Sequence, residues 1–193
     1  MTPNEYQKEA LRTANGGINN HRLLLNGAIG ACSETGEALD ILKKHLFQGH
    51  ELDISHLRKE LGDIAWYLAV SAAKAGIQFE DVVNLEFTEG QKIVLKQMDL
   101  MPIDDQLMSS LVGLNTNTSK LLWYVYSLFT GDVDGAVSIK NLLSLCCFEL
   151  SLSCHAIGAT LQDICEENVM KLRARYPKGF EVNRSLKREA GDE

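Results

Sequence analysis

Hydrophobic residues recur every three or four positions along almost the whole chain, and no convincing run alternates between apolar and polar positions as a half-buried strand does. This pattern predicts an all-α protein. Segments such as "NGG", "MPIDD" and "YPKGF" interrupt the pattern where helices are expected to end. The helices are expected at 4–15, 23–47, 54–75, 79–97, 104–130, 135–157 and 160–175, with an irregular tail after them.

Two of the predicted breaks repeat further along the chain. "HLFQGH" resembles "SLFTGD", and "AGIQFEDVV" resembles "IGATLQDIC". Gly49 and Gly131 are 82 positions apart, and so are Gly76 and Gly158. We therefore predict a duplication, in which two related helix-loop-helix units pack as a pseudo-dimer in a helical bundle. The expected division is a single domain made of units 1–98 and 104–180, followed by a polar tail at 181–193.

The composition is typical of a globular protein. Hydrophobic residues make up 45% and charged residues 23%, and the net charge of -7 provides no basic footprint for a nucleic-acid polymer. No apolar stretch reaches the length of a membrane span, and the first residues lack the pattern of a secretory signal. The five cysteines lack CxxC spacing, so we interpret them as free thiols in a reducing compartment. We expect a cytoplasmic protein.

Two acidic motifs mark the first predicted unit. "SETGE" contains Glu34 and Glu37, and "RKELGD" contains Glu60 and Asp63. Residues three positions apart share a helix face, and a short turn makes the two helices antiparallel neighbours, so the four carboxylates can converge. Each motif also contains a glycine, which costs roughly 1 kcal/mol in a helix interior. Clustered like charges in this setting indicate a functional site rather than a solvated face.

Four converging carboxylates require cations. Oxygen ligands without histidine or cysteine favour Mg²⁺, with Mn²⁺ as a substitute. A di-iron site in a helical bundle would use Glu-x-x-His pairs, but Glu37 and Asp63 occupy the third position of the two motifs. The pattern therefore predicts a magnesium site and disfavours iron.

The second predicted unit lacks these acids. The corresponding residues are Leu142 and Leu145 for the second motif and, for the first motif, Thr116 and Ser119 or, one residue later, Asn117 and Lys120. If the acids carry the chemistry, the chain has one working site, in an active first unit, and a degenerate second unit.

The acidic motifs resemble those of the MazG-like nucleoside triphosphate pyrophosphohydrolases, whose all-α superfamily has the signature ExxE, a spacer, and ExxD. The stretch 27–68 carries this signature, and "ENVMKLRARYPKGF" at 167–180 is similar to the segment that follows it in the family. Together these stretches cover somewhat under half of the chain. The resemblance implies hydrolysis of a (deoxy)nucleoside triphosphate to the monophosphate and pyrophosphate, with a role in removing unwanted or modified nucleotides.

The resemblance also implies roles for the acids. Metal ions held by the four carboxylates would orient the phosphate and activate a water molecule, and Glu37 or Glu34 would accept the proton of that water. In single-copy relatives the Asn-x-x-Lys segment closely follows the helix after ExxD, whereas here it ends the second unit. One chain is therefore expected to do what two subunits do in those relatives.

Several further residues are candidates for substrate binding. Asn168, Lys171 and Arg175 share a face of the last predicted helix and would suit a triphosphate. Tyr67 lies one turn after Asp63, where a ring could pack against a sugar or base. Weaker candidates are Asn26 for a base edge and Lys44 for phosphate.

Other conspicuous residues are assigned to the core. Trp66, Tyr124 and Phe47 stand at helical spacing, where aromatic residues are usually buried. His155 lies in an apolar helix and is expected to be a hydrogen-bonded core histidine. The apolar segment "LLSLCCFELSL" either packs inside the pseudo-dimer or forms the interface of a homodimer, and the sequence leaves both open.

Two alternatives to this function stay open. One is an enzyme like phosphoribosyl-ATP pyrophosphohydrolase, which would use the same metal chemistry on a different nucleotide. The other is a non-catalytic nucleotide-binding or helical interaction module. A substrate panel separates the first alternative from the main prediction, and nucleotide binding without turnover would support the second.

Overall fold

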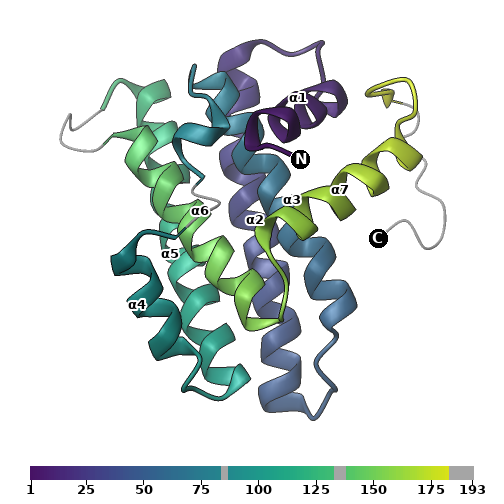
Figure 1. Cartoon of the computed structure of the whole chain (residues 1–193). Helices are drawn as coiled ribbons and strands as arrows, with labels where there is room; N and C mark the ends of the chain where they lie inside the picture. Colours follow the sequence, from purple (N-terminus) through teal and green to yellow (C-terminus); the bar gives the residue numbers. More distant parts are fainter. Residues whose placement is uncertain (84–86, 133–137, 183–193) are drawn as a thin grey trace.

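The computed structural model describes residues 1–83, 87–132 and 138–182, and in these ranges it contains helices and no strand (Figure 1). The predicted all-α fold is therefore confirmed. The elements are α1 (Pro3–Thr13), α2 (Asn20–Gln48), α3 (Ile54–Lys74), the short 3₁₀ helix η1 (Phe79–Asp81), α4 (Glu89–Met98), α5 (Ile103–Thr130), α6 (Ile139–Ala156) and α7 (Leu161–Arg175).

Four long helices form the centre of the molecule. Helix α2 packs against α3 and α5, and α6 packs against α5 and α3, so the four lie side by side as a bundle (Figure 1). Fully buried leucines supply much of the core, with Leu61 and Leu68 on α3, Leu114 and Leu121 on α5, and Leu143 on α6. Leu61 and Leu68, like Leu114 and Leu121, are seven positions apart, which places each pair on one helix face that the bundle buries.

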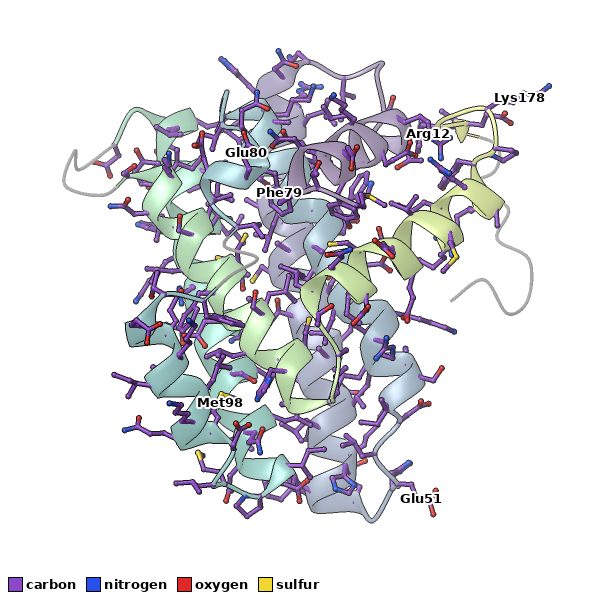
Figure 2. The ribbon with its side chains drawn as sticks, in the orientation of Figure 1. Arg12, Glu51, Phe79, Glu80, Met98 and Lys178 are labelled. Carbon is purple, nitrogen blue, oxygen red and sulfur yellow. The ribbon has the colours of Figure 1, made fainter. Side chains whose placement is uncertain are left out.

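Helices α1 and α7 lie across this bundle. The axis of α7 makes an angle of 93° with that of α6, and α7 contacts α3, α1 and α6. Capping boxes stabilise the N-termini of both crossing helices: Thr2 and Glu5 form one at α1, and Thr160 and Asp163 form one at α7. Figure 2 shows side chains of α1 and of the segment after α7, including Arg12 and Lys178, at the same end of the molecule. These crossing elements cover one face of α3.

The repeated breaks have repeated geometry. After the end of α3, the Ile77 N–H donates to the Ala72 carbonyl at 2.9 Å. After the end of α6, 82 positions later, the Ala159 N–H donates to the Cys154 carbonyl at 3.0 Å. This geometry is consistent with the predicted duplication, which itself stays a prediction. Left-handed glycines, with φ from 70° to 77°, follow all four bundle helices at the predicted positions: Gly49, Gly76, Gly131 and Gly158.

Two predicted helices differ most from the structure, and the other predicted boundaries lie within three residues of those observed. The helix expected at 79–97 is divided into η1 and α4, because Thr88 and Gln91 form a capping box that starts a new helix. The Thr-x-x-Gln signal for this start is present in the sequence. The helix expected at 135–157 runs from Ile139 to Ala156, and residues 135–137 lie outside the described residues, as do 183–193 of the predicted tail.

The aromatic assignments are confirmed in part. Trp66 and Tyr124 are partly buried against the core. The prediction that Phe47 is a core residue is wrong: Phe47 is 74% exposed, because it lies in the last turn of α2, where Leu46 packs against the core instead. His155 is hydrogen-bonded as predicted, but its Nε2 pairs with Asp99 Oδ1 at 2.6 Å at the surface rather than in the core.

The state of the cysteines and the lengths of the helices agree with two expectations from the sequence: free thiols and no membrane-spanning stretch. All five cysteines are free, and four of them are buried. In the three described ranges, no single helix is long and apolar enough to cross a membrane. Helices α6 and α7 reach that length and composition only as a bent pair.

Candidate metal and nucleotide site

Three of the predicted acids converge between α2 and α3. A short turn after Gly49 makes the two helices antiparallel neighbours, which brings Glu34 and Glu37 of α2 opposite Glu60 of α3. One carboxylate oxygen of each glutamate lies within 4.8 Å of the others. Glu60 is buried, Glu34 is half-buried and Glu37 is exposed, so the cluster extends from the helix interface to solvent. We call these three residues the carboxylate cluster.

The carboxylate cluster resists full ionisation. Burial, together with the nearby charge of Asp63, raises the pKa of Glu34 to about 8. Burial also raises the pKa of Glu60, although a hydrogen bond with Glu34 acts in the opposite direction on Glu60. The opposite effects of this hydrogen bond on the two pKa values are those expected when protonated Glu34 donates to the Glu60 carboxylate. A cation bound among the three oxygens would offset this repulsion.

A histidine adjoins the cluster. His56 Nε2 lies 2.8 Å from Glu60 Oε1, and the two residues are four positions apart on α3. Sequence reasoning missed His56, although its spacing from Glu60 places both on one helix face. The histidine side chain is 46% exposed and borders the same cleft as the acids.

The fourth acid, Asp63, is held by α7. Lys171 Nζ lies 2.7 Å and 2.6 Å from the two carboxylate oxygens of Asp63, and Asn168 Nδ2 donates to one of them at 2.9 Å. The Tyr6 hydroxyl of α1 donates to Asn168 Oδ1 at 2.9 Å and so orients its amide. Asp63 therefore stands beside the carboxylate cluster with an ammonium group as its partner, rather than within the group of three.

Gly62 permits this contact between α3 and α7. A Cβ atom at Gly62 would lie 3.1 Å from the Asn168 Cβ and 3.2 Å from its Nδ2. Such distances are tighter than ordinary van der Waals contacts. The glycine of the second acidic motif is thus explained by the close approach of the helix that carries Asn168 and Lys171.

The carboxylate cluster opens into a cleft of about 680 Å³, a volume suited to a nucleotide-sized ligand. Because α2 and α3 run antiparallel, Asn26, which precedes Glu34, and Tyr67, which follows Asp63, lie toward the same end of the cleft. Residues from the end of α1 and from the end of α7 complete the lining: Thr13, Asn15, Ile18, Leu172, Arg175, Tyr176 and Phe180. The cleft thus has an acidic end and an end rich in aromatic and amide groups.

The predicted substrate-binding residues are distributed unevenly. Tyr67, Asn26 and Arg175 line the cleft. Asn168 and Lys171 meet Asp63 at its border and also line a neighbouring cavity between α3 and α7. Lys44 does not line the cleft, because its ammonium group pairs with Asp40 at 2.7 Å on the exposed side of α2.

Sequence reasoning also missed the aromatic residues Tyr176 and Phe180. The segment "YPKGF" was interpreted as the end of the last helix and as part of the family-like stretch 167–180, but neither of its rings was assigned a role in the site. Trp66, assigned to the core, is both packed against the core and part of the cleft lining. Its indole N–H donates to the Ala10 carbonyl at 3.1 Å and to the Thr13 hydroxyl at 2.9 Å.

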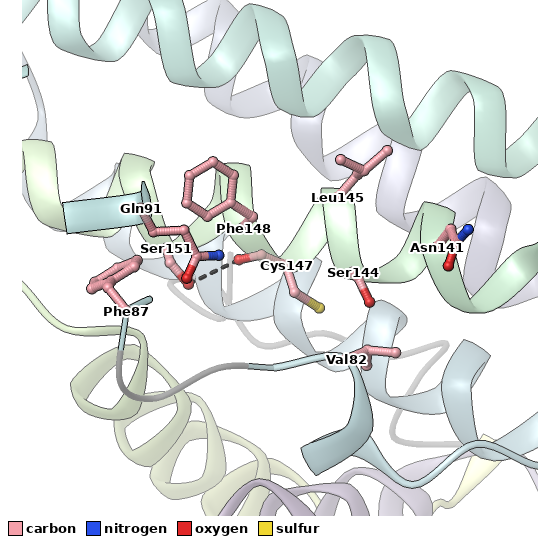
Figure 3. Close-up of a pocket in the computed structure, with 9 residues that line it drawn as sticks. All are labelled: Val82, Phe87, Gln91, Asn141, Ser144, Leu145, Cys147, Phe148 and Ser151. Carbon is pink, nitrogen blue, oxygen red and sulfur yellow. Dashed lines mark hydrogen bonds between the residues drawn. The ribbon is translucent and has the colours of Figure 1, made fainter. Parts of the chain in front are cut away.

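A second cavity, of about 450 Å³, lies along α6 (Figure 3). Val82, Phe87 and Gln91 border it from the other side. No acidic residue is among the residues that line it in the described part of the chain: Val82, Phe87, Gln91, Asn141, Ser144, Leu145, Cys147, Phe148 and Ser151. This apolar groove therefore lacks the ligands that the cleft offers a metal ion.

Comparison with known families places the acids in a recognised segment. The family model described as MazG nucleotide pyrophosphohydrolase domain matches residues 27–88, about a third of the chain. This segment contains Glu34, Glu37, Glu60 and Asp63, whereas α1, α5, α6 and α7 lie outside it. No curated protein and no solved structure matched the chain. The sequence resemblance is thereby confirmed: residues 27–88 match the MazG nucleotide pyrophosphohydrolase domain, and the all-α fold is consistent with it.

Proposed function

We propose that the protein hydrolyses a (deoxy)nucleoside triphosphate to the nucleoside monophosphate and pyrophosphate with the help of Mg²⁺. One observation carries the proposal: Glu34, Glu37 and Glu60 converge in the segment that matches the pyrophosphohydrolase domain. The adjoining cleft supports it, because about 680 Å³ accommodates a nucleotide. Removal of unwanted or modified nucleotides is the corresponding cellular role.

The donor set of the carboxylate cluster fits Mg²⁺. Carboxylate oxygens are hard ligands, and Mg²⁺ is usually held by a few carboxylates together with substrate phosphates. Burial and the neighbouring carboxylates raise the pKa of Glu34, and a bound cation would offset both effects. Mn²⁺ prefers the same ligands and would substitute. The bound ion would neutralise phosphate charge and lower the pKa of an attacking water molecule.

The side chains around the ion would have separate roles in accepting a proton, binding phosphate and contacting the nucleoside. Glu34 and Glu37 face the cleft, and one of them accepts the proton of the attacking water. Asp63 holds Lys171 at the border of the cluster, where the ammonium group can also meet a phosphate. Arg175 lines the same cleft and supplies a second cation for the phosphates. Tyr67 and Asn26 contact the nucleoside.

The proposal is tested by following phosphorus resonances. The full-length protein would be incubated with ATP, the common deoxynucleoside triphosphates and oxidised or deaminated analogues, with Mg²⁺ or with chelator. We expect monophosphate and pyrophosphate to form in the samples with Mg²⁺ and not in those with chelator. Nucleoside diphosphate and inorganic phosphate as products, or no turnover of any substrate, would contradict the proposal.

A further inference from the structure

The five residues after α7 turn back toward the cleft. Tyr176 and Phe180 both line it, and their ring centroids lie 5.7 Å apart with planes tilted by 36°. The Gly179 N–H donates to the Tyr176 carbonyl at 3.1 Å and closes the turn between the two rings. Residues 176–180, which we call the aromatic turn, thus form one wall of the nucleoside end of the cleft.

Contacts with α1 fix the aromatic turn. Arg12 Nη1 donates to the Tyr176 carbonyl at 2.7 Å, while Arg12 Nε donates to Glu9 at 3.2 Å. Gly179 has a φ of +95°, and a Cβ atom there would lie 3.2 Å from the Arg12 carbonyl. The aromatic turn therefore rests directly on the end of α1, and a side chain on Gly179 would both strain the backbone and press against the Arg12 carbonyl.

The same end of α1 orients another part of the cleft lining. The hydrogen bonds from the Trp66 indole to Ala10 and Thr13 hold its ring. Trp66 in turn meets Tyr67 edge to face, with centroids 4.8 Å apart. Rings from α3 and from the aromatic turn thus border one space, and the last turns of α1 hold both sets.

From these contacts we propose that Arg12 is a positioning residue for nucleoside recognition, because it holds the aromatic turn against α1. The inference rests on the proposed function. Rings that are already fixed bind a planar base with little loss of conformational entropy. The carboxylate cluster lies on α2 and α3 and makes no contact with Arg12, so loss of Arg12 weakens nucleotide binding and leaves the hydrolytic step intact.

The variants Arg12→Met and Gly179→Ala test this assignment. The first removes the bond to Tyr176, and the second forces the aromatic turn away from α1 by a different route. Each should raise KM for nucleoside triphosphates about tenfold and leave kcat within about threefold. Inhibition by inorganic tripolyphosphate, which has no base, should be unchanged.

Arg173→Met is the matched control. Arg173 also pairs with Glu9, at 2.9 Å, but it is exposed and does not bond to the aromatic turn. It should leave KM unchanged. The inference is overturned if Arg12→Met leaves KM unchanged while the protein stays folded by circular dichroism, if tripolyphosphate inhibition weakens equally, or if Arg173→Met has the same effect.

Binding can be measured separately from turnover. The chain has two tryptophans, so Trp123→Phe leaves Trp66 in the cleft as its single tryptophan. If the wild type binds ATP or a deoxynucleoside triphosphate without hydrolysing it, the proposed function fails. Arg12→Met should still lower the nucleotide affinity, measured from the change in Trp66 fluorescence, about tenfold. Unchanged nucleotide affinity in that variant, or no nucleotide binding by the wild type, would overturn the inference.

Discussion

Helices α3 and α6 occupy comparable places in the bundle but carry different chemistry. Helix α3 presents Glu60 and Asp63 to a cleft of about 680 Å³. Helix α6, 82 positions later, has Leu142 and Leu145 in their place, and Leu145 borders a groove of about 450 Å³ (Figure 3). Both helices end in the same turn geometry. Similar backbone positions can therefore carry different side chains, and only acidic side chains such as those on α3 could bind a metal ion there.

The segments that lie over the two helices differ as well. Helix α7 brings Lys171 and Asn168 to Asp63 on α3. On α6, Phe87 and Gln91 border the groove and contribute no charge. The ion pair beside the acids of α3 and the uncharged lining of the groove on α6 thus follow from the segments that lie over these two places.

The largest expected difference between the two regions concerns catalysis. Glu60→Gln removes a charge from the carboxylate cluster and should lower kcat/KM by on the order of 100-fold or more, since even an outer partner of a metal ligand is worth about 10- to 100-fold. Glu149→Gln alters a half-buried acid on α6. Pyrophosphate release should stay within about twofold of wild type in this control, and equal losses in both variants would contradict a single site.

Lys171→Met removes the cation that α7 brings to Asp63. The four acids then attract metal more strongly, whereas the phosphates lose a charge-assisted hydrogen bond. We expect KM for the nucleotide to rise about tenfold, which corresponds to about 1.4 kcal/mol, and the Mg²⁺ concentration for half-maximal activity to fall. Steady-state kinetics over a Mg²⁺ series measures both. A rise in both quantities would show that Lys171 does not compete with metal for Asp63.

Substitution of one glycine that faces α3 and of one that faces α6 compares the packing of these two helices. A Cβ atom at Gly30 would overlap the ring of Tyr67, whereas one at Gly113 would lie 2.7 Å from the flexible end of Glu149. Gly30→Ala should lower the free energy of unfolding by about 1 to 2 kcal/mol, because overpacking outweighs the helix propensity of alanine. Gly113→Ala should be close to neutral, since Glu149 can move. Urea denaturation would reveal the opposite order if Tyr67 were free to shift.

The pH dependence of stability gives the smallest expected effect. In the metal-free protein the folded state holds a proton on Glu34 up to about pH 8, whereas the unfolded chain releases it near pH 4.5. The folded state therefore binds more protons in this window, and the free energy of unfolding decreases as pH rises through it. Because the cleft is open to solvent, we expect a change of about 1 kcal/mol.

Thermal unfolding in chelator at several pH values measures this change. Glu34→Gln should flatten the profile, and Mg²⁺ should restore stability at the alkaline end. Burial also raises the pKa values of Glu149 and Glu60, so Glu149→Gln should flatten part of the remaining profile and leave the Mg²⁺ response intact. A metal-free protein that becomes more stable toward pH 8 would contradict the assignment.

The sequence predicted the elements that depend on local periodicity. Glu34 with Glu37 and Glu60 with Asp63 could be placed on helix faces because their spacing is three, and the short turn after Gly49 brought the helices together. The structure agrees on the helical hairpin and on the convergence of three of these acids. Regular spacing thus sufficed for the part of the site that two adjacent helices build.

The rest of the site depends on contacts between distant segments. Lys171 is 108 positions from Asp63, and Arg12 is 164 positions from Tyr176. Nothing in the spacing of either pair indicates that they meet, because the crossing of α1 and α7 over α3 is set by tertiary packing. Phe47 shows the converse: its apolar character suggested burial, but the last turn of α2 extends beyond the core.

We propose that the chain contains one metal-dependent nucleotide site, on α2 and α3. Isothermal titration of the full-length protein with a non-hydrolysable α,β-imido nucleoside triphosphate, in Mg²⁺ and then in chelator, tests it most directly. With a single site of this kind, we expect one nucleotide to bind per chain with Mg²⁺ and the affinity to fall strongly in chelator. Two nucleotides per chain, or affinity that chelator leaves unchanged, would contradict it.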